Sequence, residues 1–247
     1  MQLSVILIAL FVFLLAGVSK GISGMGLPLV ATPILTVMFD LPTAIALTVP
    51  ATVATDCFML VKTFEKWSTL KKAAVLTLTG IGGMIIGSTI LVMTDSNLLA
   101  GLLGVVIIFF VISSLTSFLP QFTKPPLWVD GAVGLVGGTL QGAAGASGPL
   151  ISLYFLQMNV SRYQFLFLIN CYFVVIDITQ LITISSLGFY QGNTLFLYAL
   201  LAIVPSFLGL ALAMKIQKFI TDSVFKYSVL SLVGISGVLL LYKALFS

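Results

Sequence analysis

Uninterrupted apolar runs of about twenty residues recur along the whole chain, and each is long enough for a helix to cross a bilayer. Of the 247 residues, 60% are hydrophobic and only 7% are charged. A soluble domain carries about a quarter charged residues, and a transmembrane barrel would show short segments of alternating polarity. The sequence therefore predicts an all-α, polytopic membrane protein.

The composition also argues against several classes of chemistry. The net charge of +4 comes mostly from basic residues at the ends of apolar runs, so no nucleic-acid partner is expected. The chain has no histidine, which removes the common hydrolase triads and zinc motifs. Cys57 and Cys171 lie inside apolar segments and suggest neither a disulfide nor a metal site. We expect no cofactor, no metal site and no enzymatic activity.

Ten apolar segments are expected, separated by turn signals such as FDLP, MTDSN and GFYQGN. They lie at residues 2–18, 28–38, 42–62, 70–93, 98–118, 127–141, 149–158, 161–187, 193–215 and 221–245. The first segment lacks the basic start and the cleavage site of a signal peptide, so we expect it to be retained. The segments at 28–38 and 149–158 are too short to cross a bilayer unaided.

The two halves of the chain resemble each other at a constant offset of 121 positions. The stretch KGISGMGLP at 20–28 aligns with QGAAGASGP at 141–149, and Asp56 aligns with Asp177. This agreement indicates an internal duplication of five segments per half, which is typical of transporters. We expect a first repeat at residues 1–119, a linker at 120–126 and a second repeat at 127–247.

Because each repeat has an odd number of segments, the second repeat is expected to be inverted relative to the first. The charges agree, since basic residues concentrate on the cytoplasmic side of membrane proteins. In the first half, the lysines cluster around the loop after the third segment: Lys62, Lys66, Lys71 and Lys72. In the second half, they cluster around the loop after the fourth segment: Lys215, Lys218 and Lys226. Both chain ends would then lie outside, whether each short segment crosses fully or belongs to a re-entrant hairpin.

Each short segment follows one of the two glycine-rich stretches, which we expect to interrupt the helices. Pro28 and Pro149 suit the first turn of a new helix, and Ser147 lies near a cap position. Each break would present a helix N-terminus, whose free N–H groups and partial positive charge favour an anion. Irregular backbone at membrane depth is tolerated where it lines a cavity, so we expect both breaks to meet at one anion site near the midplane.

The expected anion site takes in both breaks and one asparagine. Its residues are Lys20, Gly21, Ser23, Gly24, Gly26, Pro28, Gln141, Gly142, Gly145, Ser147, Gly148, Pro149 and Asn170. Lys20 could supply a full positive charge, or it could be a cytoplasmic lysine that only sets orientation. The site glycines could contact the anion, or they could let helices pack closely, as we expect for Gly80, Gly83 and Gly87.

Two acidic residues, Asp56 and Asp177, lie within apolar segments. Charged side chains at this depth usually face a cavity or a partner. A carboxyl group that loads and releases a proton could couple anion movement to the proton gradient, with Thr52 and Gln180 helping to bind a proton or a coupling ion. The alternative is a structural hydrogen bond, such as one between Thr52 and Asp56. Pro50 is expected to kink its helix nearby.

In each half, a glycine-rich break is followed by a Pro-Leu pair and then by a span that ends in polar residues. This duplicated pattern resembles the sulfite exporter TauE/SafE family, also called the toluene sulfonate uptake permease family. The resemblance covers about residues 5 to 245. It implies a carrier of sulfur-containing anions, such as sulfite, sulfonates or sulfoacetate, in the cytoplasmic (inner) membrane of a prokaryote. The family's glycine motif corresponds to Gly21, Gly24, Gly26, Pro28, Gly142, Gly145, Gly148 and Pro149. Met25 and Leu27 depart from the denser glycine run that members often have.

These observations favour a secondary transporter that moves a small anion by alternating access, coupled to H⁺ or Na⁺. The chain has no Walker A sequence that would bind ATP. The expected partners are a small anionic substrate, the co-ion and the lipid bilayer, and a homo-oligomer is left open. An anion channel and a non-transporting membrane accessory protein are the alternatives.

Overall fold

The fold consists of helices throughout the residues that the computed structural model describes. These are residues 3–24, 27–66, 70–71, 73–116, 126–156, 158, 160–192, 194–216 and scattered positions between 227 and 245. The first half contains α1 (Leu3–Ser23), α2 (Pro28–Met38), α3 (Leu41–Lys62), α5 (Ala74–Met93) and α6 (Ser96–Thr116). The second half contains α7 (Leu127–Ala144), α8 (Gly148–Leu156), α9 (Arg162–Ser186), α10 (Thr194–Leu201) and α11 (Ile203–Ile216). In these parts of the chain no strand is present.

Side-chain caps set where several of these helices begin. Asp40 accepts a hydrogen bond from the Thr43 N–H at 2.9 Å and so caps α3. Ser161 and Gln164 form a reciprocal capping box at the start of α9. Asp95 accepts from the backbone just inside α6, at the turn predicted from MTDSN. Local sequence therefore fixes these boundaries without help from tertiary contacts.

Five described helices, counting α10 and α11 as one, are long and apolar enough to cross a membrane. They are Val5–Ile22, Leu41–Lys62, Ala74–Met93, Tyr163–Ser186 and Thr194–Ile216. The predicted short segment at 28–38 matches α2, and the one at 149–158 matches α8 closely. The predicted segment at 193–215 is divided at Ala202 into α10 and α11, and the segment at 221–245 falls largely outside the described residues.

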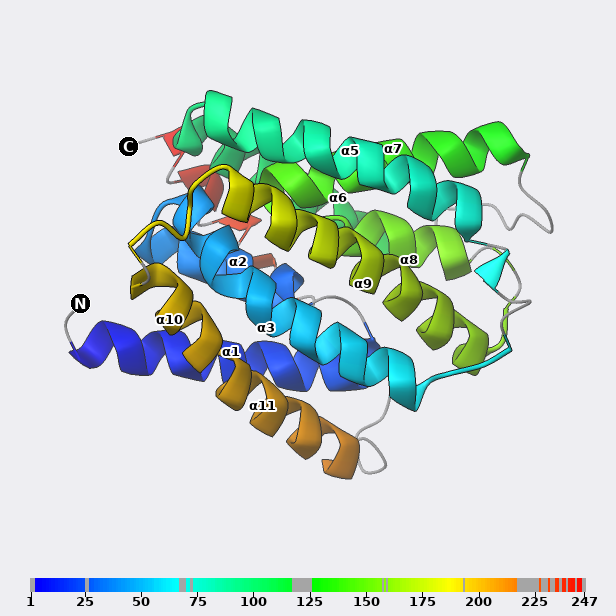
Figure 1. Ribbon diagram of the computed structural model, residues 1–247, viewed down its shortest axis with the longest axis horizontal. Coiled ribbons are helices and arrows are strands. Elements are labelled where there is room, and N and C mark those ends of the chain that lie inside the picture. The colour runs from blue at the N-terminus through cyan, green and yellow to red at the C-terminus, as the bar shows by residue number, and fades with distance from the viewer. Residues whose placement is uncertain are drawn as a thin grey trace.

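The helices form three layers (Figure 1). One layer pairs α5 with α7, the opposite layer pairs α1 with α11, and α3 packs on α9 between them. Helices 121 positions apart make equivalent contacts, since α1 corresponds to α7 in the aligned halves and α3 to α9. Each outer layer therefore combines one helix from each half of the chain.

Glycines allow close backbone approach in both outer layers. A Cβ added at Gly83 would overlap the Leu135 carbonyl, so this α5 glycine packs against α7. A Cβ added at Gly209 would overlap the Leu14 carbonyl, in the contact between α11 and α1. Leu14 and Leu135 are 121 positions apart, and Gly83 and Gly209 are 126 positions apart, so α1 and α7 repeat at one offset and α5 and α11 at a slightly larger one. The packing role predicted for Gly83 is confirmed, as are those of Gly80 and Gly87.

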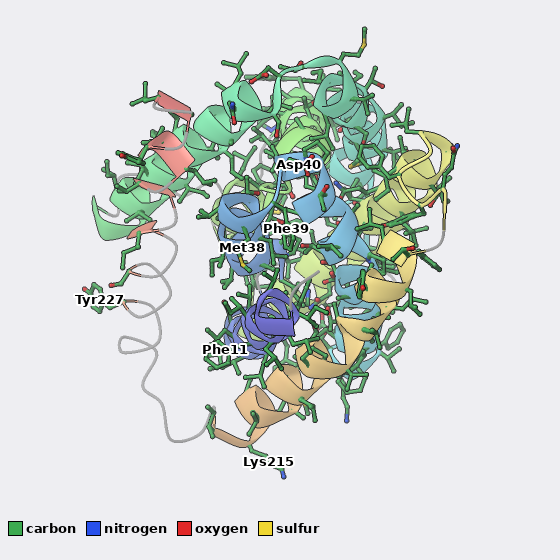
Figure 2. The ribbon with its side chains drawn as sticks, turned by 90° about the vertical axis from the view of Figure 1, so that its left-hand side faces the viewer. Phe11, Met38, Phe39, Asp40, Lys215 and Tyr227 are labelled. Atoms are coloured by element: carbon green, nitrogen blue, oxygen red, sulfur yellow. The ribbon has the colours of Figure 1, made fainter. Side chains whose placement is uncertain are left out.

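The central helices α3 and α9 run in opposite directions (Figure 1). The last turn of α3 carries Lys62 and lies at the same end of the molecule as the start of α9. At the other end, where α1 begins, Met38, Phe39 and Asp40 connect α2 to α3 (Figure 2). Since α1 begins and α2 ends at that side, α2 runs back toward the start of α1 (Figure 1).

Candidate functional site

The same helix ending occurs in both halves of the chain. Gly24 has φ 68° and Gly145 has φ 65°, a left-handed conformation that glycine adopts most readily. The Gly24 N–H donates to the Lys20 carbonyl at 2.9 Å, and the Gly145 N–H donates to the Gln141 carbonyl at 2.8 Å. Each bond closes a left-handed C-cap, which ends α1 and α7 at equivalent positions.

The breaks are shorter than the sequence predicted. The helical conformation continues through Lys20 to Ser23 in α1 and through Gln141 to Ala144 in α7. The expectation that each glycine-rich stretch is irregular from its first residue is therefore wrong. Glycine weakens a helix by only about 1 kcal/mol, and close packing of α1 and α7 against neighbouring helices offsets that cost.

The second arm of each break begins where the prolines predicted. Pro28 is the first residue of α2, and Pro149 is the second residue of α8. Ser147 immediately precedes α8, and its carbonyl accepts the first bond of that helix from Ile151. The Ser147 hydroxyl, however, donates to Oε1 of Gln141 at 2.8 Å, so it ties α8 back to the end of α7.

Lys20 is fully buried and forms an ion pair with Asp56, which is also fully buried. The Lys20 ammonium lies 3.5 Å from Oδ1 of Asn170 and 5.7 Å from the ring centre of Phe173. The alternative that Lys20 is a surface lysine at the cytoplasmic loop is therefore wrong. Lys20 instead links the end of α1 to α3 and α9 inside the protein.

The second half repeats this pairing with an uncharged partner. Nε2 of Gln141 donates to Oδ1 of Asp177 at 2.9 Å. Each pair joins residues 36 positions apart, and the two pairs are related by the offset of 121. Gln180 adds a second link, because its Nε2 donates to the Gln141 carbonyl at 3.1 Å. The two pairs therefore occupy equivalent positions in the two halves, but only the first pair contains a cation.

The two pairs meet where α3 packs on α9. The carboxyl groups of Asp56 and Asp177 are electrostatic neighbours at this contact. Both side chains are 0% exposed, and Oδ2 of each has no donor among the described residues. A buried carboxylate oxygen without a donor is costly, so this contact favours a bound proton or cation. We call Lys20, Asp56, Gln141, Asn170, Asp177 and Gln180 the polar cluster.

The break in the second half also contacts the short helix of the first half. A Cβ added at Gly145 would lie 3.1 Å from the Thr32 hydroxyl and 3.7 Å from Pro28, both in the first turns of α2. The Thr32 hydroxyl is buried and has no hydrogen-bond partner among the described residues. The start of α2 and the end of α7 therefore lie together, as the sequence predicted for the two breaks.

Two predicted site glycines face neighbouring helices instead of the polar cluster. A Cβ added at Gly21 would overlap Ala213 of α11, and one added at Gly142 would meet the backbone of Met84 and Ser88 in α5. The close-packing alternative accounts for both. Gly24 and Gly145 remain at the breaks.

Several predicted residues have more limited roles in what is described. The Thr52 hydroxyl donates to the Thr48 carbonyl at 3.0 Å, so the alternative pairing of Thr52 with Asp56 is wrong. Gly148 begins α8. Gly26 lies outside the described residues, as do the side chains of Ser23 and Pro149. Among the described residues, no three His, Cys, Asp or Glu side chains come together to hold a metal ion.

Sequence reasoning missed three buried hydroxyls without a described partner. They belong to Thr32, Ser88 and Tyr172. In the sequence, each of them is a single polar residue within an apolar run. Many helical threonines and serines have the same surroundings. Most of those donate to the carbonyl four residues earlier, as Thr36 and Thr48 do here, so the sequence alone does not distinguish the unpaired ones.

A cavity of about 300 Å³ lies between α1, α3, α10 and α11, and its lining is almost wholly apolar. Its lining residues are Ile6, Ala9, Leu10, Phe13, Leu47, Tyr198, Leu201, Ala202, Val204 and Pro205. None of them belongs to the polar cluster. The cavity is therefore separate from the site that could bind an anion.

The protein has broken apolar helices, helix pairs that are repeated between its two halves, and a buried polar cluster. Together these features define a multi-pass membrane protein of the transporter class. The chain matches the family described as sulfite exporter TauE/SafE over residues 9–240. It therefore belongs to the TauE/SafE sulfite exporter family, as the duplicated glycine motif indicated. No match was found among curated proteins or among solved structures.

Proposed function

We propose that this protein is a secondary transporter for a small sulfur-containing anion of the sulfite, sulfonate or sulfoacetate class, driven by H⁺ or Na⁺. The observation that carries the proposal is the meeting of two equivalent pairs, Lys20 with Asp56 and Gln141 with Asp177, beside two helix breaks. A charged cluster this deep in an apolar protein is costly, and it is retained where a substrate or a coupling ion needs it.

The anion would bind between the breaks, close to Lys20. The N-termini of α2 and α8 provide N–H groups and the positive ends of helix dipoles, to which Lys20 adds a full charge. The unpaired Thr32 hydroxyl is placed to donate to the same ligand. In this proposal Gly24 and Gly145 shape the breaks, and Gly21 and Gly142 contribute through helix packing.

Alternating access would move two units past each other at the polar cluster. The pairs α5–α7 and α1–α11 are held by glycine contacts at backbone distance, which favours movement of each pair as one body. The contact between α3 and α9 lies between these pairs. Since every member of the polar cluster has an exposed fraction of 1% or less, the arrangement corresponds to a closed state from which either side could open.

An inverted repeat gives the simplest account of the topology. It is supported by the opposite directions of α3 and α9 and by the equivalent contacts of α1 with α11 and of α7 with α5. We propose that α1–α2 and α7–α8 are hairpins, that the end carrying Lys62 faces the cytoplasm, and that the membrane is the inner membrane of a prokaryote.

A channel is the second candidate, and the buried cluster argues against it. A conducting pore needs a continuous wet path, whereas Lys20, Asp56 and Asp177 are wholly buried in the described arrangement. A binding site that closes around its ligand agrees better with this burial.

Flux into liposomes tests the proposal. The purified protein would be reconstituted, and the flux of labelled sulfite, isethionate and sulfoacetate would be measured under an imposed pH gradient and then under a sodium gradient. The proposal predicts saturable flux of at least one of these anions and stimulation by one gradient. Flux that rises linearly with substrate would favour the channel, and no flux of any of the three anions would overturn the proposed substrate class.

A further inference from the structure

The polar cluster contains one cation and two carboxyl groups. Lys20 carries a positive charge, and its ion-pair partner Asp56 carries a compensating negative charge. Asp177 accepts a hydrogen bond from the uncharged Gln141 amide and has no cation as its own partner among the described residues. With both carboxyls ionised, these three side chains, all 0% exposed, would hold a net charge of −1, with the two carboxylates as neighbours.

A proton between the two carboxyl groups resolves this conflict. Two adjacent buried carboxylates repel each other, whereas one shared proton forms a hydrogen bond between them. That proton would give a donor to one of the otherwise unpartnered Oδ2 atoms of Asp56 and Asp177. The cluster then contains one positive charge and one negative charge, and its net charge is zero.

No other described side chain can neutralise the two carboxyl groups in place of this proton. The titratable side chains that interact with the two carboxyls are Lys20, Cys57 and Tyr172. Cys57 and Tyr172 are neutral in the protonated forms that a thiol and a phenol ordinarily hold at neutral pH. The neighbouring helices α2, α5 and α6 contribute no titratable side chain. The described titratable side chains on α7, α8, α10 and α11 do not act on either carboxyl: Asp130, Tyr154, Tyr198 and Lys215. Lys20 is therefore the single cation of the cluster within the described chain.

Lys20 cannot bind a substrate anion while Asp56 neutralises it. Adding an anion to the neutral cluster would create a buried net charge of −1. If Asp56 takes up a proton, its bond to the Lys20 ammonium weakens and the ammonium becomes available to the anion. The net charge of the loaded cluster then returns to zero.

We propose that the empty site already holds one proton between Asp56 and Asp177, and that it takes up one further proton with each singly charged anion. This inference rests on the proposed function, and it specifies the coupling ion, the stoichiometry and the charge of the substrate. Transport is then an electroneutral symport of one H⁺ with one monovalent anion. The proton enters onto the Asp56 carboxylate, and on release it leaves the same oxygen as Lys20 returns to Asp56.

The charge balance also selects among substrates. A singly charged anion, such as hydrogen sulfite or a sulfonate, leaves the loaded cluster neutral. A doubly charged anion leaves it at −1 even with both carboxyls protonated, and the described cluster has no further cation to compensate. The transported species is therefore singly charged, which narrows the proposed class to hydrogen sulfite and monosulfonates and excludes sulfoacetate, which is doubly charged at neutral pH.

Flux at a clamped membrane potential tests the stoichiometry. Liposomes containing the unaltered protein would be set to inside-positive, zero and inside-negative potentials with potassium and valinomycin. The flux of labelled isethionate, a sulfonate that stays singly charged near neutral pH, and the internal pH would be followed together. The inference predicts equal initial rates at all three potentials and one proton per anion. A potential-dependent rate, a ratio of two, or sodium-driven flux without proton movement would overturn it while leaving the transporter proposal standing. Absence of flux would instead count against the proposed function.

The resident proton has its own test, which does not require transport. The infrared carbonyl band of protonated carboxyl groups would be compared between the unaltered protein and Asp177→Asn at neutral pH. We expect the variant to lose the intensity of one buried protonated carboxyl, and we expect Asp40→Asn, at an exposed helix cap, to lose none. Equal bands in the unaltered protein and Asp177→Asn would overturn the shared proton. The flux experiment needs no variant, so it decides the coupling even if Asp177→Asn does not fold.

Discussion

Lys20 and Asp56 form an ion pair that is 0% exposed on both sides, between the last turn of α1 and the middle of α3. The equivalent positions in the second half are Gln141 and Asp177, joined by an uncharged hydrogen bond. The two halves therefore repeat the same pairing of side chains, but only the pair in the first half contains a cation. In the proposed function, this asymmetry would let the site bind an anion without two lysines repelling each other.

Replacing one residue of the Lys20–Asp56 ion pair should destabilise the protein more than replacing both. Asp56→Asn removes the ion-pair partner of a buried lysine, which costs about 3–5 kcal/mol in the free energy of unfolding. Lys20→Met combined with Asp56→Asn removes both charges and should recover most of that loss. Thermal unfolding in detergent would compare the two variants, and a double variant no more stable than Asp56→Asn would contradict the pairing.

The glycine contact between α5 and α7 can be tested against a control on the same helix. Gly83→Ala places a Cβ on the Leu135 carbonyl, and overpacking of this kind costs about 1–3 kcal/mol. Gly82→Ala has nothing within 4 Å of its new Cβ and should be neutral or stabilising by about 1 kcal/mol through helix propensity. Equal unfolding temperatures for the two variants would show that α5 and α7 are not packed this closely.

The helix break at Gly145 should tolerate some substitutions and not others. Gly145→Ala forces a side chain into a left-handed conformation, at a cost of about 1–2 kcal/mol, whereas Gly145→Asn should cost less. Gly192→Ala imposes a similar backbone strain at φ 96° in the loop before α10. We expect both alanine variants to lose stability and only Gly145→Ala to lose transport. Unfolding temperature and flux would be measured together, and equal flux losses would mean that stability alone explains them.

Asp130 is a third acid buried among the helices, and we expect it to be structural. The Tyr154 hydroxyl donates to Oδ1 of Asp130, which links α7 to α8 away from the polar cluster. Tyr154→Phe leaves a buried acceptor without its donor and should cost about 1–3 kcal/mol. The proton-to-anion ratio of transport should not change. A changed ratio would mean that Asp130 takes part in proton coupling.

Local signals in the sequence were sufficient for most helix boundaries. The prolines at 28 and 149 and the caps at Asp40 and Ser161 act within one helical turn, and the helices begin where these residues indicate. The internal offset also brought Lys20, Gln141, Asp56 and Asp177 into the candidate site. In contrast, α1 continues past its glycines because packing against α11 compensates for their weak helix propensity, and that contact is not visible in the local sequence.

The pairings within the site could not be predicted from the sequence. Lys20 and Asp56 are separated by 36 positions, and both an orientation role and a binding role fit the lysine when α1 is considered alone. Likewise, the hydroxyl of Thr52 lies one turn from Asp56 yet bonds to its own helix. Only the arrangement of α1, α3, α7 and α9 in space determines which polar groups meet.

The most direct test of the account is anion flux through the Lys20→Met/Asp56→Asn double variant. This variant removes the cluster's cation and the carboxyl group that neutralises it, so it should fold while losing the counter-charge for the substrate. Reconstituted beside the unaltered protein and Asp40→Asn, it should show no saturable sulfite or sulfonate flux under a pH gradient, whereas Asp40→Asn should retain the full rate. Saturable, proton-driven flux through the folded double variant would contradict the claim that the anion binds at Lys20.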